Sequence, residues 1–554
     1  MTDNLTLFQA FEWNAPADQR HYRRLRHILP HLKGVGINRL WIPPASKGHH
    51  PKGNGYDIYD LYDLGEFHQK GSRSTKWGPK EDLMDLAKDA QNAGIGLYYD
   101  AVLNHRCGGD ATERVKVVVV DPKDRRKDLA RPHDIEAWLR FDFPDRKDKY
   151  SAFKYNWHHF NASDYDNRTG KKAIFKIVAD GKDWADDVDK SANGNYDYLL
   201  LNNLDYSRPD LREEVNRWGQ WIVQELNLSG FRLDAVKHIS RSFVDEWTSS
   251  VSASYQRELF YVGEHWTDDA DALSKWLSTA PSNFSLFDAP LLYNLAKTSW
   301  SKDPDLRRVF KDSLVERRPR NAVTLVMNHD TQHGQMLDTP IKPTFVALAY
   351  SLILLRKDGY PCVFYGDVYG LYDPHPSPPT CWGKLPDLIL ARKLYAYGNQ
   401  TDYFERKDCI GWVRSGDPSK SGGAGLAVIM SWQKERRSSS ASMLDKLRLV
   451  FQRSNPELPF PTAGGVAVAE GSTPGPETLK PPPPRMRMKV GREHAGKIWR
   501  DLLGWEWADV TIDANGFGLF PCQPNSLAVF TAADAAGREK FPVQFDTNIY
   551  QQRT

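Results

Sequence analysis

The chain has 554 residues, enough for one large enzyme domain with appendages or for about two to four smaller domains. Lys and Arg (74) nearly balance Asp and Glu (71), and the resulting net charge of +3 argues against nucleic acid as the main partner, because phosphate binding favours a clear basic excess. The hydrophobic content of 40% and the mean hydropathy of -0.60 predict a soluble globular protein, with no partner membrane.

Helix-like and strand-like segments alternate along much of the chain. Four segments with apolar residues at helical spacing each precede a strand-like one: 21–33 before 38–43, 79–93 before 95–102, 213–226 before 230–234, and 243–255 before 259–263. Gly34 and Gly94 stand where the first two helices are expected to stop. This alternation predicts an α/β fold with a parallel sheet and outer helices, and so many units favour an eight-stranded barrel over a doubly wound sheet.

The alternation is interrupted once and later ends. Between about residues 106 and 207 the sequence is polar and rich in Asp, which predicts an inserted loop-rich or β subdomain. Beyond about residue 398 only short β-like pieces follow, as is typical of a β-sandwich. Residues 455–484 contain nine Pro and four Gly, so we expect a disordered or loosely ordered insertion at about 434–488.

Ionisable side chains gather where several predicted strands end. They are Asp100, His105, Arg232, Asp234, Glu264, His329 and Asp330. In a barrel the carboxyl ends of the strands form one face, and active sites lie there. One such carboxylate is more often a helix cap or an ion-pair partner, but four with an Arg and two His are difficult to explain in that way. The set is suited to glycoside hydrolysis, in which one carboxylate attacks the anomeric carbon and another protonates the leaving oxygen.

Four segments resemble, in order, the signature segments of the α-amylase family: DAVLNHR (100–106), GFRLDAVKH (230–238), VGEHW (262–266) and VMNHD (326–330). The resemblance is especially close to liquefying bacterial α-amylases and their intracellular fungal relatives, and it covers nearly the whole chain. It implies a (β/α)8 TIM barrel, an inserted B domain and a C-terminal antiparallel β-sandwich. The implied domain boundaries are 1–104 and 207–397 for the barrel, 105–206 for the B domain and 398–554 for the C-terminal domain.

The resemblance also implies a retaining mechanism on α-1,4-linked glucans. Asp234 would be the nucleophile, Glu264 the acid/base and Asp330 the transition-state stabiliser. The residues implied to bind or organise the substrate are Tyr56, Asp100, His105, Arg232, Lys237, His238, Trp266 and His329. Glu264 must be protonated when it donates, so we expect an apolar environment, to which Trp266 contributes, to raise its pKa.

Calcium binding is where the sequence departs from the family pattern. The positions that correspond to the conserved site are Asn104, Asp197, Asn203, Asp205 and His238, the last through its backbone carbonyl. Asn203 stands where an Asp is expected, as does Asn161 of a related calcium–sodium–calcium cluster, and calcium affinity depends on the number of charged ligands. We therefore expect at most one weakened calcium site. The alternative is that Asp197 and Asn203 only hydrogen-bond the B domain to the barrel.

The favoured function is an endo-acting α-amylase on starch, glycogen or maltooligosaccharides, without an organic cofactor. A 4-α-glucanotransferase with the same carboxylates is the second candidate, and an inactive glycan-binding or scaffold protein is the third. The presence of all three catalytic carboxylates argues against the third. We expect a monomer in the cytoplasm, because the N-terminal sequence MTDNLTLFQAFEWN lacks signal-peptide features and the five cysteines are widely spaced.

Overall fold

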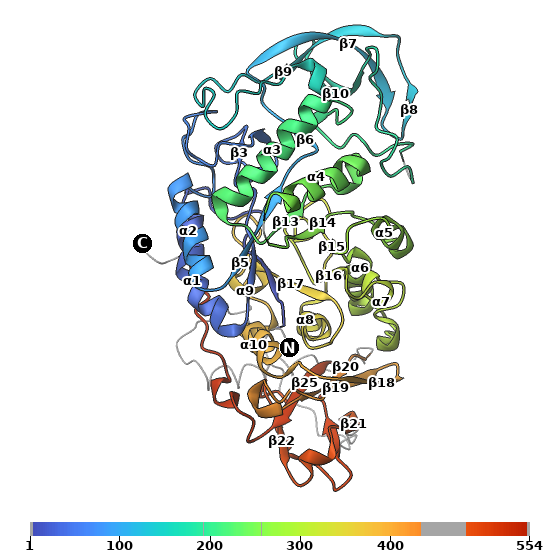
Figure 1. Ribbon diagram of the computed structural model, residues 1–554. Coiled ribbons are helices and arrows are strands. Elements are labelled where there is room, and N and C mark those ends of the chain that lie inside the picture. Colours follow the sequence, from blue (N-terminus) through green and yellow to red (C-terminus); the bar gives the residue numbers. More distant parts are fainter. Residues whose placement is uncertain (1–3, 192, 256, 434–482, 551–554) are drawn as a thin grey trace, which may run out of the picture.

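The computed structural model describes residues 4–191, 193–255, 257–433 and 483–550. Three parts follow one another along its long axis in Figure 1, with the inserted B domain at the top, a barrel in the middle and the C-terminal sheets at the bottom. In the described part of the chain, no helix combines the length and apolar character needed to cross a bilayer.

Eight strands form a closed barrel in the order β1-β17-β16-β15-β14-β13-β5-β2, and every neighbouring pair is parallel. The strands are β1 (Leu7–Gln9), β2 (Arg39–Trp41), β5 (Gly96–Ala101), β13 (Gly230–Leu233), β14 (Phe260–Gly263), β15 (Phe284–Phe287), β16 (Ala322–Leu325) and β17 (Tyr360–Phe364). They are short and almost completely buried, as expected for strands covered on both faces. The predicted parallel barrel is confirmed.

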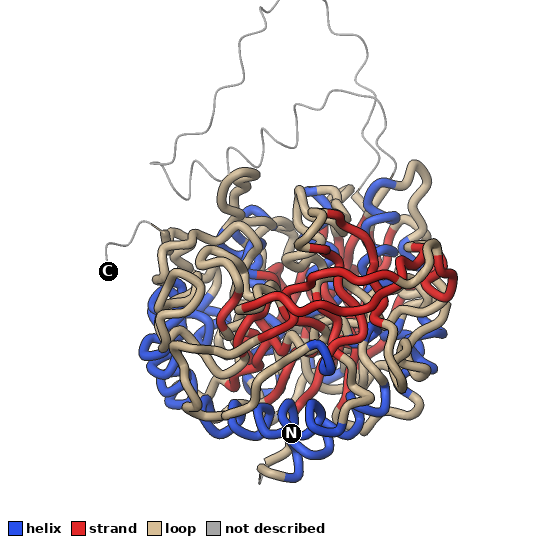
Figure 2. The backbone as a smooth tube through the Cα atoms, turned by 90° about the horizontal axis from the view of Figure 1, so that it is seen from above, coloured by secondary structure: helices blue, strands red, loops and turns tan. Residues whose placement is uncertain are grey.

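Helices surround the strands, and Figure 2 shows them in blue around a red centre. They are α1 (His21–Val35), α2 (Lys80–Asn92), α3 (Pro209–Leu226), α4 (Arg241–Ala253), α5 (Ala270–Leu277), α6 (Ala289–Trp300), α7 (Leu314–Arg317), α8 (Val346–Leu354), α9 (Tyr365–Tyr369) and α10 (Leu385–Tyr395). Helix α1 does not stop at Gly34. It continues to Val35 and is capped by Gly36, whose φ of 119° and N–H bond to the Leu32 carbonyl make the left-handed cap that glycine permits.

The B domain is an antiparallel sheet inserted between β5 and α3, with strand order β6-β12-β10-β11-β7-β8 and β9 also paired with β7. Its strands are β6 (His105–Arg106), β7 (Ala111–Asp121), β8 (Asp124–Asp128), β9 (His133–Arg140), β10 (Phe160–Asp166), β11 (Lys171–Ile177) and β12 (Asn202–Leu204). Strands β6 and β12 are its connections to the barrel, so their residues stand close to the carboxyl ends of the barrel strands (Figure 1).

The C-terminal region consists of antiparallel sheets. One has the order β18-β19-β20-β25-β22-β23, and the other pairs β21 with β24. The strands are β18 (Gln400–Arg406), β19 (Cys409–Arg414), β20 (Leu426–Ser431), β21 (Arg485–Lys489), β22 (Ile498–Asp501), β23 (Val510–Thr511), β24 (Phe517–Pro521) and β25 (Ser526–Ala532). The expected insertion at 434–488 lies outside the described residues up to 482. Its last residues form β21 instead, because the alternating Met486 and Met488 are buried against the larger sheet.

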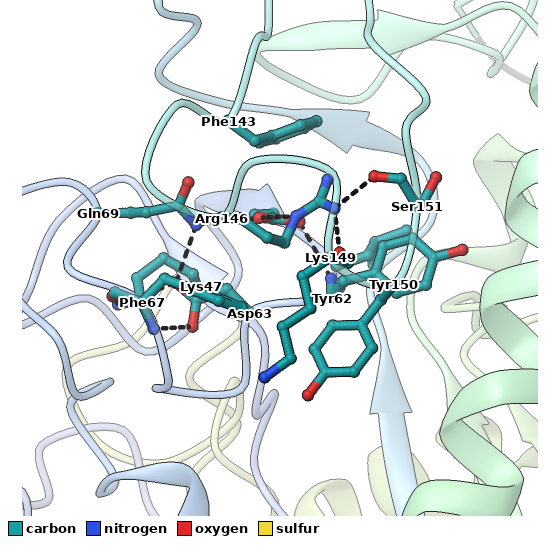
Figure 3. Close-up of polar contacts among 12 residues, drawn as sticks. Lys47, Tyr62, Asp63, Phe67, Gln69, Phe143, Arg146, Lys149, Tyr150 and Ser151 are labelled. Atoms are coloured by element: carbon teal, nitrogen blue, oxygen red, sulfur yellow. Dashed lines mark hydrogen bonds and ion pairs between the residues drawn. The ribbon is translucent and has the colours of Figure 1, made fainter.

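Two buried basic side chains hold a barrel loop that contains the hairpin of β3 (Lys47–Gly48) and β4 (Ile58–Asp60), and one of them, Arg146, joins it to the B domain (Figure 3). Lys47 Nζ donates to three backbone carbonyls within residues 67–73 and lies 3.2 Å from Asp63 Oδ2. Arg146 of the B domain donates to Asp60 Oδ2 at 2.7 Å, and both side chains are 1% exposed. Satisfied buried charges of this kind fix one arrangement of two segments.

Candidate active site

One arginine joins three carboxylates at the carboxyl ends of three neighbouring barrel strands. Arg232 on β13 pairs in register with Asp100 on β5, which places both side chains on the same rim. Arg232 Nη1 donates to Asp100 Oδ1 at 2.8 Å and to Asp234 Oδ1 at 2.6 Å, and Nη2 donates to Glu264 Oε2 at 2.7 Å. The Arg232 side chain is 1% exposed, so these charge-assisted bonds are shielded from water.

Burial and repulsion between neighbouring carboxylates raise the pKa values of three acidic groups on this rim. Burial raises the pKa of Glu264 to about 8, repulsion from Asp234 and Asp330 adds to the rise, and Arg232 opposes it. Burial likewise raises the pKa of Asp330 to about 7 and that of Asp100 to about 6. Shifts of this kind, produced by desolvation and like charges on one rim, are typical of acid–base catalytic sites.

A chain of hydrogen bonds fixes the ring of His329 beside Asp330. Gln9 Nε2 donates to His329 Nδ1 at 3.0 Å, so the ring proton is on Nε2. Nε2 lies 2.8 Å from the Tyr56 hydroxyl and 3.3 Å from Asp330 Oδ2, and Tyr56 in turn donates to Asp100 Oδ2 at 2.9 Å. Burial holds the pKa of His329 well below its usual value, so the ring is a neutral donor.

The remaining predicted substrate residues lie around this centre with different partners. His105 is 1% exposed and donates from Nε2 to the Tyr56 carbonyl at 2.8 Å. Lys237 Nζ lies 3.8 Å from the centroid of the Tyr196 ring, and His238 Nδ1 donates to the Tyr196 carbonyl. Trp266 donates from its indole N–H to the Tyr293 hydroxyl at 2.9 Å. Burial is the first cause of the raised pKa of Glu264, two residues before Trp266.

Aromatic and amide residues at the first two strand ends were missed from the sequence. Trp41, the last residue of β2, donates to Asp100 Oδ2 at 2.9 Å. Trp13 stacks on Tyr56 with an interplanar angle of 9° and on His329 with 11°. For Trp13 the signal is the segment QAFEW (9–13), which begins with the last residue of β1 and which a search for carboxylates alone does not find.

Comparisons with known proteins show the family of this chain. The family model of the α-amylase catalytic domain matches residues 25–438. The chain is 40% identical over 529 residues to an α-amylase of Bacillus licheniformis, covering 95% of this chain and 93% of that protein. The chain belongs to the α-amylase family. It is also 35% identical over 541 residues to the cytoplasmic α-amylase of Escherichia coli, with 95% and 98% covered.

The fold is shared with solved structures of the same family. An α-amylase from Geobacillus thermoleovorans, complexed with acarbose, superposes with a TM-score of 0.58 at 16% identity, covering 96% of this chain and 98% of that one. At this identity the likeness supports the fold, and the longer sequence matches carry the family assignment.

The residues expected to bind calcium in the α-amylase family do converge, but as a hydrogen-bond network. Asp197 Oδ2 accepts from Asn161 Nδ2 at 2.7 Å and from the Ala185 backbone N–H at 2.8 Å. Asp197 Oδ1 accepts from Asn203 Nδ2 at 3.2 Å. Burial raises the pKa of Asp197 to about 6. The carboxylate that would carry the charge of a metal site therefore faces N–H donors.

N–H donors also meet the expected calcium ligands on the barrel side of the junction, where the B domain joins the barrel. Asn104 Nδ2 donates to the His238 carbonyl at 2.8 Å and contacts the Asp197 carbonyl at 3.4 Å. Calcium requires about six to eight oxygen ligands, and among the described residues no group of three or more His, Cys, Asp or Glu side chains is placed to hold a metal. Asn203 Oδ1, which has no partner, is one neutral oxygen. The donor set does not fit calcium, and the contacts favour the alternative in which Asp197 and Asn203 join the B domain to the barrel.

Proposed function

We propose that this chain is a retaining endo-hydrolase of α-1,4-glucosidic bonds in starch, glycogen or maltooligosaccharides. Asp234 is the nucleophile, Glu264 the general acid/base and Asp330 the stabiliser of positive charge on the sugar. We also propose the domain division at residues 104, 206 and 397. The family membership and the relatives named α-amylase support this activity.

The assignment of roles depends on a difference between the hydrogen bonds of Asp234 and those of Glu264, both of which contact Arg232. Asp234 Oδ1 accepts from Arg232 Nη1 at 2.6 Å, and its other oxygen, Oδ2, is not part of this bond. Glu264 Oε2 accepts from both Arg232 and the Ala235 backbone N–H, at 2.7 and 3.1 Å. With Oε2 occupied by two donors and the pKa at about 8, the proton of Glu264 resides on Oε1 at neutral pH.

These positions support the two steps of a retaining reaction. First, Asp234 Oδ2 attacks the anomeric carbon while Glu264 Oε1 gives its proton to the glycosidic oxygen, so that the C–O bond breaks and a glycosyl ester forms. Second, Glu264, now ionised, takes a proton from water, whose oxygen attacks the same carbon and releases Asp234. Asp330 and the Tyr56–His329 pair face the charge that develops on the sugar in both steps.

Product analysis on one defined maltooligosaccharide tests the proposal. We expect the wild type to produce only shorter sugars with a retained anomeric configuration, and Asp234→Asn to lose at least about 10³-fold in kcat/KM with an unchanged melting temperature. Products longer than the starting sugar would indicate the glucanotransferase. If neither enzyme form cleaved the sugar, the chain would be an inactive glycan-binding protein.

A further inference from the structure

The ammonium of Lys182, in the B-domain loop between β11 and β12, has three oxygen partners. Nζ donates to the carbonyl oxygens of His158 and Phe160, both at 2.8 Å, and to Asp205 Oδ2 at 2.7 Å. The Lys182 side chain is 5% exposed and that of Asp205 3% exposed. Every N–H of the ammonium thus has an acceptor in a site from which water is nearly excluded.

The three partners belong to elements that meet at the junction of the B domain and the barrel. His158 lies in the short helix η1 (Trp157–His159), Phe160 begins β10, and Asp205 directly follows β12. The other oxygen of Asp205 accepts from the backbone N–H of Ser207 at 3.1 Å, next to the start of α3. One ammonium therefore connects the loop, the B-domain sheet and the return of the chain to the barrel.

Two carbonyls and a carboxylate around one point are also the donor set that a bound cation would use. Here the positive charge comes from a side chain. The neighbouring Asp197 carboxylate is satisfied in a corresponding way, by the amides of Asn161 and Asn203 and by a backbone N–H. Across this junction, N–H donors of the chain itself meet the oxygens that would otherwise require an ion.

We propose that Lys182 is a covalently attached cation that replaces a metal ion at the junction, so that the B domain is held on the barrel without bound calcium or sodium. This inference concerns stability and is independent of the proposed function. A cavity of about 320 Å³ borders Asn161, Asp197 and Asp205. This cavity is where an added ion would bind at the junction, so the response of the protein to added ions tests the proposal.

The melting temperature provides that test. We expect the wild type to melt within about 1 °C of the same temperature in EDTA, in calcium chloride, and in choline chloride that replaces sodium chloride, because no site gains free energy from an ion. Lys182→Met keeps the apolar stem but leaves the buried Asp205 carboxylate unpaired, so we expect its melting temperature to fall by roughly 5 °C or more. Lys182→Arg, which keeps the charge, should lose less.

Lys190→Met is the matched control, because Lys190 lies in the same loop, is 51% exposed and pairs with Asp186 at 3.5 Å. We expect almost no change in its melting temperature. A fall in EDTA that calcium reverses, or a fall without sodium, would show that a bound metal holds the junction and would overturn the proposal. Equal melting temperatures of Lys182→Met and Lys190→Met would also overturn it. The wild-type measurement decides even if Lys182→Met does not fold.

Discussion

Two buried cations, Arg232 and Lys182, define two regions of the molecule that are built from similar groups and behave differently. Arg232 contacts three carboxylates on the barrel rim. Lys182 contacts one carboxylate and two neutral carbonyls. The rim therefore has three carboxylates around its cation, whereas Lys182 has one.

The comparison shows how the number of carboxylates per cation separates a catalytic site from a structural one. On the rim, burial, together with repulsion from Asp234 and Asp330, raises the pKa of Glu264 to about 8, which stores a proton that the substrate can receive. At the junction, Lys182 and Asp205 form a one-to-one ion pair, and the Asp205 side chain is 3% exposed. An excess of like charge reduces stability but raises the pKa of a catalytic acid, whereas a one-to-one ion pair holds two segments together.

The largest effect is expected when the proton of Glu264 is removed from the catalytic rim. We expect Glu264→Gln to lose at least about 10³-fold in kcat/KM on starch, because the glycosidic oxygen would leave without protonation. Steady-state kinetics with maltosyl fluoride, whose leaving group needs no proton, should show a much smaller loss. Glu213→Gln, on the outside of α3 with a 74% exposed side chain, is the control and should match the wild type.

The pH profile provides the second readout for the same residue. The raised pKa means that Glu264 is protonated below about pH 8 and loses its proton as the pH rises through that value. The kcat/KM of the wild type should therefore fall on the alkaline side near pH 8, and the residual activity of Glu264→Gln should not. An unchanged alkaline fall in the variant would assign the acid to another group.

Arg146 and Asp60 form a second buried one-to-one ion pair, in the cluster of Figure 3. We expect Arg146→Met to lower the melting temperature by roughly 5 °C or more, because it leaves the buried Asp60 without its partner, while kcat at a temperature well below melting stays near that of the wild type. Arg140→Met, which removes an exposed pair with Asp142, should melt like the wild type. A selective loss of kcat would instead connect this cluster to catalysis.

Gln9 tests a smaller effect on the catalytic side. Gln9→Leu removes the donor to His329 Nδ1 and with it the preference for the tautomer that faces Tyr56 and Asp330. We expect kcat/KM to fall about 10-fold with little change in melting temperature, as for the loss of one buried hydrogen bond. Gln91→Leu on the exposed side of α2 is the control. Equal kinetics of the two variants would remove Gln9 from the positioning network.

The sequence predicted the elements whose periodicity is visible and missed those without it. Helix α3 has buried residues at helical spacing, such as Val215, Trp218 and Ile222, and was predicted. Helix α8 is buried on all sides, so its apolar residues have no helical period from which a helix could be predicted. Strand β15 is four residues long and precedes α6 without a charged site residue, so it was not predicted.

The functional residues also divide into those that sequence motifs predict and those that they do not. Motifs placed Asp234, Glu264 and Asp330 on one rim, because the carboxyl ends of parallel strands must meet. The partners of Lys182 could not be predicted, because they are backbone carbonyls and an Asp more than 20 residues away, brought together by the sheet of the B domain. Substitution of Asp by Asn at position 203 indicated a weaker metal site, but the sequence has no pattern that identifies the replacing charge.

The barrel closes only when its first and last strands pair, so the catalytic site can form only late in synthesis of the chain. Strand β1, with Gln9 at its end, pairs with β2 on one side and with β17 on the other. Until residues 360–364 have emerged, β1 has an open edge and the rim lacks its last neighbour. A nascent chain that ends before β17 therefore has all three carboxylates but no complete site, and the onset of glucan hydrolysis reports that the whole barrel has closed.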